Sequence, residues 1–265
     1  MNKILQYHKH NISYDISGQG PAIVFLHGFL ETKEIWEDFS KYLSGEFTVI
    51  AIDLPGHGGS DVLAEIHTMG LMADVIHDIL DHHGFREVVI GGHSLGGYIA
   101  GEFASKYPSE VKGLFFFHSH AAPDNDETRE NRRRSINIVK QNQTGFVNEF
   151  IPALFDPKYV ENFKDQITVM QQRAAKMSAE AIIASIAGMR ERTGSLPYLF
   201  TTETPVLFII GKQDPRLSYN VVLAQALIPA HSEVLMLDNV GHMGYLEAPR
   251  QTMQTIRHFA LKCCE

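Results

Sequence analysis

Three residues that lie far apart in the sequence, Ser94, Asp214 and His242, have the types and settings that nucleophilic catalysis requires. A serine hydroxyl is a poor nucleophile near neutral pH. It needs a base to take its proton and a carboxylate to hold that base in the right tautomer. Each of the three residues follows a short apolar run that is typical of a buried strand. We therefore expect them to converge at one edge of a sheet.

The local sequence around Ser94 predicts a sharp turn between a strand and a helix. An apolar run at 88–90 precedes the serine, and apolar residues spaced for one helix face follow it. Gly92 and Gly96 flank the serine in the pattern Gly-x-Ser-x-Gly. Because glycine has no side chain to collide with neighbouring backbone, this pattern lets Ser94 take a strained conformation beside the positive end of a helix.

The wider pattern of apolar segments predicts eight strands, at residues 3–8, 12–16, 22–26, 47–52, 88–90, 112–117, 205–210 and 233–237. The first two are expected to form an antiparallel hairpin around His10 and Asn11 at a sheet edge. Helical patterns alternate with the later strands, at 34–43, 67–83, 219–227 and 249–261. This alternation indicates an α/β fold with an eight-stranded, mostly parallel, doubly wound sheet.

Residues 121–200 interrupt this alternation. They show no strand pattern but four helical stretches, at 124–142, 144–155, 158–176 and 178–192. An all-helical insertion after the sixth strand would lie over the carboxyl ends of the strands, where such sheets bind ligands. We therefore expect residues 1–120 and 201–265 to form the core and residues 121–200 to form a helical cap.

Composition and charge narrow the classes of partner. The 265 residues are 44% hydrophobic, as in an ordinary globular protein, and a net charge of −8 argues against a nucleic-acid partner. Cys263 and Cys264 are adjacent and are the only cysteines, so no disulfide framework is expected. We find no signal-peptide pattern and no run of membrane-spanning length, so we expect a cytoplasmic protein without a membrane partner. The oligomeric state stays open.

A family resemblance rests on five motifs: His27-Gly28-Phe29, Asp53-x-Pro55-Gly56-x-Gly58-x-Ser60, Gly92-His93-Ser94-Leu95-Gly96-Gly97, Gly211-x-x-Asp214 and Gly241-His242. With these motifs, the chain resembles the α/β-hydrolase superfamily and, within it, the cap-bearing serine esterase-like group. The resemblance covers residues 22–120 and 203–261 and is more specific for fold than for substrate. It implies Ser94 as nucleophile, Asp214 as acid, His242 as base, and the backbone N–H groups of Phe29 and Leu95 as the oxyanion hole.

Two other aspartates compete with Asp214 for the role of the acid. Asp238 lies four residues before His242, but it ends a strand and is better placed to support a turn. Asp124 follows the sixth strand, and we expect it to cap the first helix of the insertion.

Five further residues are expected in or near the substrate pocket: His27, His93, His118, His120 and Met243. His27 is expected to brace its own loop, and His93 to pack under the nucleophile. His118 and His120 follow the sixth strand and should form part of the pocket wall. No third ligand accompanies these two histidines at a telling spacing, so we expect no metal and no other cofactor.

The expected reaction is hydrolysis of carboxylic esters with small to medium acyl groups, and the expected partner is a small-molecule ester. One alternative is carbon–carbon bond cleavage. The run Glu127-x-Arg129-x-x-Arg132-Arg133 resembles the menaquinone-pathway synthase branch, where arginines bind substrate carboxylates. An anionic substrate would fit only if those arginines face the pocket. A second alternative, a binding protein without turnover, conflicts with the intact Ser94, Asp214 and His242.

Overall fold

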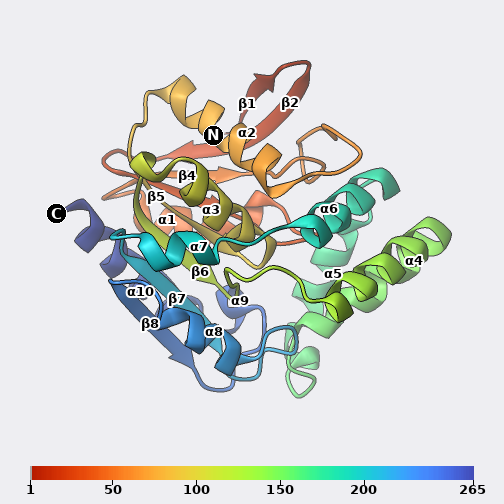
Figure 1. Cartoon of the computed structure of the whole chain (residues 1–265). Helices are drawn as coiled ribbons and strands as arrows, with labels where there is room; N and C mark the ends of the chain where they lie inside the picture. The colour runs from red at the N-terminus through yellow and green to blue at the C-terminus, as the bar shows by residue number, and fades with distance from the viewer. Residues whose placement is uncertain (1) are drawn as a thin grey trace.

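The computed structural model describes residues 2–265 and, over that range, is built on one eight-stranded sheet (Figure 1). The spatial order of the strands is β1-β2-β4-β3-β5-β6-β7-β8. β1 and β2 run antiparallel to their neighbours, and all other neighbouring pairs are parallel. The predicted fold class is confirmed. The strands are β1 (Asn2–Tyr7), β2 (His10–Ser17), β3 (Ala22–Leu26), β4 (Thr48–Ile52), β5 (Val88–His93), β6 (Val111–Phe117), β7 (Val206–Gly211) and β8 (Ser232–Leu237).

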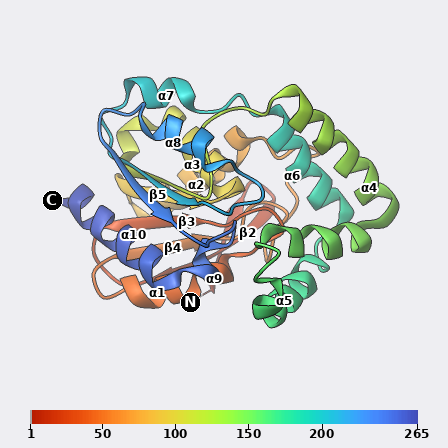
Figure 2. The same cartoon turned by 90° about the horizontal axis from the view of Figure 1, so that it is seen from below.

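Helices cover both faces of the sheet. α2 (Met69–His83), α3 (Leu95–Lys106) and α8 (Tyr219–Ala226) lie on one face, and α1 (Glu37–Leu43) and α10 (Pro249–Cys264) lie on the other (Figure 2). Every residue of β3, β4 and β5 is buried. Strands covered on both faces need apolar residues on both sides, and this explains their continuous apolar runs.

The first hairpin turns earlier in the chain than the sequence predicts. Tyr7 pairs with His10, so the turn is made by His8 and Lys9, and His10 and Asn11 belong to β2. His8 has a φ of 53°, in the left-handed region that tight turns use. All four residues between Tyr7 and Ile12 are polar, so polarity alone does not locate the turn.

The segment between β6 and β7 is helical, as expected, but its helices are divided differently. α4 (Asp126–Phe150) runs through the predicted break at Thr144 and Gly145 and is kinked at Asn142, which has φ −154° and ψ 80°. Asn142 accepts a hydrogen bond from the Gly145 N–H at 2.8 Å, so its side chain restarts the helix after the kink. α5 (Lys164–Ala174) and α6 (Ala179–Glu191) complete the segment, which lies at one end of the molecule (Figures 1 and 2).

The two ends of this helical segment meet at the core. The Ser195 N–H donates to the Ala121 carbonyl oxygen at 2.7 Å, and Arg192 forms an ion pair with Asp124. α7 (Leu196–Thr201) follows and packs on α3, although it crosses the predicted boundary at residue 200. α9 (Gly244–Glu247) is a single turn before α10. None of the helices described is both long enough and apolar enough to cross a bilayer.

Candidate active site

Ser94 occupies the turn between β5 and α3 in a conformation that residues with side chains rarely adopt. Its φ is 49° and its ψ is −110°. Its N–H donates to the Phe117 carbonyl oxygen at 3.0 Å and so ties the turn to the end of β6. A β-carbon on either Gly92 or Gly96 would collide with the Leu26 carbonyl oxygen. The two glycines are therefore required because α3 begins directly against the end of β3.

The Asp214 carboxylate, in the loop after β7, accepts four hydrogen bonds. One oxygen, Oδ1, accepts from the backbone N–H groups of Arg216 at 2.8 Å and Leu217 at 3.0 Å. The other, Oδ2, accepts from Nδ1 of His242 at 2.7 Å and from Nδ1 of His118 at 3.3 Å. Burial opposes ionisation, but attraction to His242 and the hydrogen bond from His118 outweigh it and hold the pKa of Asp214 far below its usual range.

His242 lies in the loop after β8 with one ring nitrogen committed to Asp214. Because a carboxylate only accepts, Nδ1 carries the hydrogen and Nε2 is left to take a proton. Burial lowers the pKa of His242, although attraction to Asp214 works in the opposite direction, so the ring is neutral near pH 7. A neutral imidazole with a free Nε2 is the form that a general base needs.

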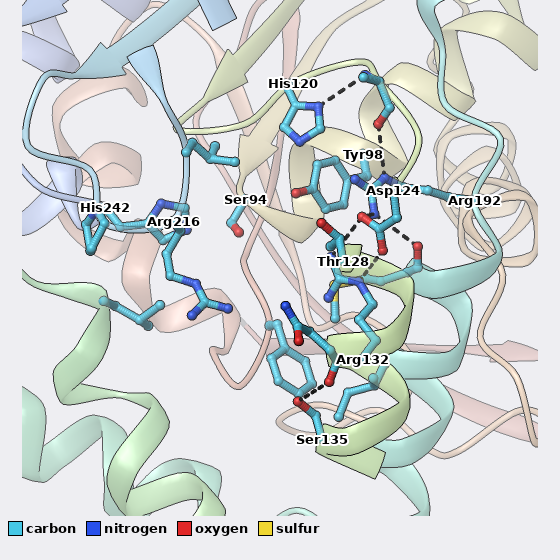
Figure 3. A pocket seen from close by; sticks show the side chains of 18 of the residues that line it. Ser94, Tyr98, His120, Asp124, Thr128, Arg132, Ser135, Arg192, Arg216 and His242 are labelled. Carbon is cyan, nitrogen blue, oxygen red and sulfur yellow. Dashed lines mark hydrogen bonds and ion pairs between the residues drawn. The ribbon is translucent and has the colours of Figure 1, made fainter. Parts of the chain in front are cut away.

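Ser94 and His242 line the same pocket, with Ser94 between two walls (Figure 3). His242 and Arg216 lie on one side, and Tyr98, Asp124 and Arg132 on the other. Within residues 2–265, the hydrogen bonds of His242 do not include one to Ser94 Oγ. Contacts of this kind often form only when substrate is bound. The structure therefore brings Asp214 into contact with His242 and places His242 and Ser94 in the same pocket, with no hydrogen bond between Ser94 Oγ and His242 among the described residues.

Neither competing aspartate contacts His242. Asp238 is 73% exposed and pairs with Lys212 Nζ at 2.7 Å, outside the pocket. Asp124 is buried and pairs with Arg132 and Arg192. The expectation that Asp124 caps the first helix of the insertion is wrong. Asn125 caps α4 instead, because its Oδ1 accepts from the Thr128 N–H at 2.8 Å, and this leaves the Asp124 carboxylate for the arginines.

The expected oxyanion donors belong to the loop after β3 and to the first turn of α3. Among the described residues, neither the Phe29 N–H nor the Leu95 N–H donates to another backbone group. Leu95 is the first residue of α3, where N–H groups have no partner within the helix. Phe29 lines the pocket, whereas the Leu95 side chain does not. Both N–H groups thus have the unpaired state that an oxyanion hole requires.

A buried ionic cluster centred on Glu31 connects three loops of the site. Its carboxylate accepts from the Gly28 N–H at 2.6 Å, from His93 Nδ1 at 2.9 Å and from the Tyr245 hydroxyl at 3.1 Å. The other ring nitrogen of His93 donates to the His242 carbonyl oxygen at 2.8 Å. Because both partners of His93 are acceptors, its ring carries two hydrogens and a positive charge.

The charges of this cluster stabilise each other. Burial alone would disfavour both ions. Against that penalty, attraction to His93 lowers the pKa of Glu31, and attraction to Glu31 raises the pKa of His93. Sequence analysis did not single out Glu31, although it lies two residues beyond Phe29 in the same loop.

The pocket has a volume of about 630 Å³ and is lined by residues of both the core and the helical segment. Two of the five predicted pocket residues, His93 and His120, line it. His27, His118 and Met243 are buried and do not line it. His27 instead braces its own loop, since its Nδ1 donates to the Gly28 carbonyl oxygen at 2.8 Å and its Nε2 accepts from the Leu54 N–H at 3.0 Å.

One group of side chains could in principle hold a metal ion. His118, Asp214 and His242 each offer a ligand atom, and these atoms lie within 4.8 Å of one another. In this group both histidines direct Nδ1–H toward the carboxylate, so the nitrogens facing it are donors and not metal ligands. His120, the partner that the sequence suggests for His118, lies instead against the Tyr98 ring, with ring centroids 5.3 Å apart.

The pocket wall also carries residues that sequence analysis did not single out, chiefly Tyr98, Arg192 and Arg216. Arg216 follows Asp214 by two residues, and Arg192 ends the helical segment, so neither belongs to a recognisable motif. The basic run on α4 divides between two surfaces. Arg132 lines the pocket, whereas Arg133 and Arg134 are exposed and pair with Glu130.

Comparisons with known proteins agree with this architecture. The family model of the alpha/beta hydrolase fold matches residues 21–249, so the chain belongs to that family. A thermophilic esterase from Thermogutta terrifontis, solved with malate bound, is 30% identical, with a TM-score of 0.92 and full coverage of both chains.

Curated relatives are more distant or match only in part. An uncharacterized protein of Mycobacterium bovis is 37% identical over 107 residues, which cover 40% of this chain but only 31% of that protein. The matched part therefore spans about a third of that relative. A monoacylglycerol lipase of Bos taurus is 24% identical over 261 residues, covering 91% of this chain and 76% of the lipase.

Proposed function

We propose that the protein is a serine hydrolase that cleaves carboxylic esters with small to medium acyl groups. The observation that carries the proposal is the 2.7 Å contact between His242 Nδ1 and Asp214, in a pocket that Ser94 also lines. Membership of the family and the likeness to an esterase support the same reaction class. We further propose that residues 121–200 act as a cap, since residues of α4 and α6 line the pocket opposite the strand ends.

In the proposed reaction, Ser94 Oγ attacks the ester carbonyl carbon while His242 Nε2 takes the hydroxyl proton. The negative charge that develops on the carbonyl oxygen is held by the N–H groups of Phe29 and Leu95. His242 then returns the proton to the departing alcohol, which leaves an acyl-Ser94. A water molecule, deprotonated by His242, releases the carboxylic acid and restores the serine. Asp214 stabilises the imidazolium in both steps.

The test is burst kinetics with p-nitrophenyl acetate and p-nitrophenyl butyrate. We expect a burst of p-nitrophenolate equal to the enzyme concentration, followed by slower turnover, if deacylation limits the rate. Ser94→Ala should remove the burst and lower kcat by roughly 1,000-fold or more, because it removes the proposed nucleophile that becomes acylated. Ser105→Ala, on the exposed side of α3, is the matched control and should keep both.

The competing functions give different results in the same experiment. A burst that persists in Ser94→Ala would refute the assigned nucleophile. Absence of any acylation in the unmodified protein would refute ester hydrolysis and favour carbon–carbon cleavage or binding without turnover. Arg132 lines the pocket, as carbon–carbon cleavage of an anionic substrate would require. Arg133 and Arg134 are exposed to solvent, and this weakens that alternative.

A further inference from the structure

Three arginines approach the pocket, but two of them share a single carboxylate. Arg192 and Arg132 both form ion pairs with Asp124. Arg192 is buried, donates to the Met189 carbonyl oxygen at 3.0 Å and lies over the Tyr98 ring, so its hydrogen bonds are used within the protein. Arg132 is held by Asp124 through two of its nitrogens. These two guanidinium groups therefore form part of the pocket wall and have few free N–H donors for a ligand.

Arg216 differs from both. Among the described residues its guanidinium forms no ion pair, and its one recorded contact is with the Phe150 ring, whose centroid lies 4.9 Å from Cζ. A guanidinium has five N–H donors, and an aromatic face satisfies none of them. The side chain is exposed and lines the pocket on the same side as His242 (Figure 3).

The Arg216 backbone is fixed by the catalytic loop itself. Its N–H donates to Asp214 Oδ1 at 2.8 Å, so the arginine is anchored to the aspartate that holds His242. The planar group rests on a phenylalanine of α4, which limits the positions that it can take. An arginine held at both its backbone and its planar face is preorganised for a ligand.

The electrostatics of the pocket favour a negative group there. Three guanidinium groups line the pocket against two ionised carboxylates, Asp124 in the wall and Asp214 beside His242, while Glu31 is neutralised by His93. His120 adds no charge near pH 7, because burial, assisted by repulsion from Arg192, lowers its pKa to about 4. The wall therefore has an excess of positive charge that the protein does not compensate.

We propose that Arg216 binds a carboxylate carried by the ester substrate, so that the preferred substrates are half-esters of dicarboxylic acids or esters of carboxylate-bearing alcohols. One free guanidinium matches one carboxylate, which it can hold through two parallel hydrogen bonds. This inference rests on the proposed ester hydrolysis and specifies its substrate class. Arg216 acts on substrate selection and takes no part in proton transfer.

The test compares matched esters that differ in charge. The acyl-side pair is p-nitrophenyl hemisuccinate and p-nitrophenyl butyrate, and the alcohol-side pair is 4-acetoxybenzoate and 4-acetoxybenzamide. We expect the protein to prefer the charged member of at least one pair. Arg216→Gln should lower kcat/KM for that ester about 10- to 100-fold and change the neutral ester by less than about threefold. Arg216→Lys should keep part of the preference, because it retains charge but not the planar fork.

The controls separate this inference from the proposed reaction. Arg134→Gln removes an exposed charge on α4 that is paired with Glu130, and it should leave all four esters unchanged. If both pairs show no charge preference, or if Arg216→Gln weakens charged and neutral esters equally, the inference is wrong while ester hydrolysis stands. Calorimetry with succinate measures the site without turnover. Binding that Arg216→Gln weakens supports an anion site even if no ester is cleaved, and no binding to the unmodified protein overturns it.

Discussion

At the scale of single residues, Glu31 links parts of the site that are distant in the sequence. It contacts Gly28 in the loop after β3, His93 beside Ser94, and Tyr245 three residues after His242. His93 in turn holds the His242 carbonyl oxygen. A single buried carboxylate thus helps to set the relative positions of three loops. It is linked to His242 only through His93 and the His242 backbone carbonyl oxygen, so we assign it no part in proton transfer.

Glu31→Gln tests this role. An amide has one acceptor oxygen, so it cannot serve Gly28, Tyr245 and a doubly protonated His93 together. We expect the free energy of unfolding, measured in urea, to fall by about 3 kcal/mol, the usual cost of breaking a buried ion pair from one side. Glu34→Gln, at a 40% exposed neighbour, is the control and should change stability by less than about 0.5 kcal/mol. Equal losses in the two variants would contradict the role assigned to Glu31.

Sequence reasoning places Ser94, Asp214 and His242 at one edge of the sheet because each follows a strand of the same parallel sheet. In the structure Asp214 contacts His242, and His242 and Ser94 line one pocket. It does not find Glu31 or Arg216, because neither has a fixed spacing from the other members of its cluster. The partners of Glu31 come from residues 28, 93 and 245, and only the folded chain brings them together. Side chains that act through tertiary contacts leave no periodic signal.

At the scale of elements, the site depends on how closely α3 approaches the end of β3. Gly96 and Gly97 lie in the first turn of α3, and each would bring a β-carbon into an occupied position. The obstacle is the backbone of Leu26 for Gly96 and the side chain of Ser119 for Gly97. Backbone does not move aside as a flexible side chain does, so Gly96 is the stricter of the two positions.

Gly96→Ala should therefore destabilise the protein although alanine is the better helix former. We expect a loss of about 3 kcal/mol or more in urea unfolding, because α3 must shift away from β3. Gly70→Ala is a matched control within α2, where the nearest obstacle is Glu102 Oε1 at 3.7 Å. It should be neutral or stabilising by up to about 1 kcal/mol. A stable, fully active Gly96→Ala protein would show that the approach of the two elements is looser than described.

The predictability of the elements differs along the chain. The central strands are readable because burial on both faces demands continuous apolar residues, as at 22–26 and 48–52. The helical segment is harder to divide. Thr144 and Gly145 read as a break, yet the kink lies at Asn142, whose side chain caps the continuation. A helix that is restarted by a side-chain hydrogen bond looks interrupted in sequence but remains one element in space.

At the scale of the whole molecule, several buried histidines are held neutral. Burial lowers the pKa of His57 to about 3 and of His67 to about 4. His57 Nε2 has no hydrogen-bond partner within the described residues, and His67 Nε2 already accepts from the Leu63 N–H at 3.1 Å, so neither ring has an acceptor for a second proton. His93, whose pKa is raised by Glu31, is the opposite case.

These shifts predict acid sensitivity. In the unfolded chain the histidines take up protons as the pH falls through about 6.5, whereas the buried neutral rings resist protonation until about pH 4. Below pH 6.5 the unfolded state therefore binds more protons, and stability falls. We expect the free energy of unfolding to drop by about 4 kcal/mol between pH 7.5 and pH 5, measured by urea denaturation at each pH.

A variant identifies the groups responsible. His57→Gln removes one of the resisting rings and should flatten the pH dependence between pH 7.5 and 5, whatever it does to stability at pH 7.5. His8→Gln, at an exposed turn position, should leave the slope unchanged. Equal slopes in all three proteins would mean that other groups govern the acid response.

The helical segment that forms one side of the pocket leaves and rejoins the core at a single point, where Ser195 is bonded to Ala121 and Arg192 to Asp124. A chain segment whose ends are pinned together can be lengthened, shortened or replaced with little strain on the strands beside it. Replacing this segment should therefore change one side of the pocket and leave the strands that carry Ser94, Asp214 and His242 in place. For protein engineering, the junction at Ala121 and Ser195 is the natural place at which to exchange the helical segment for another.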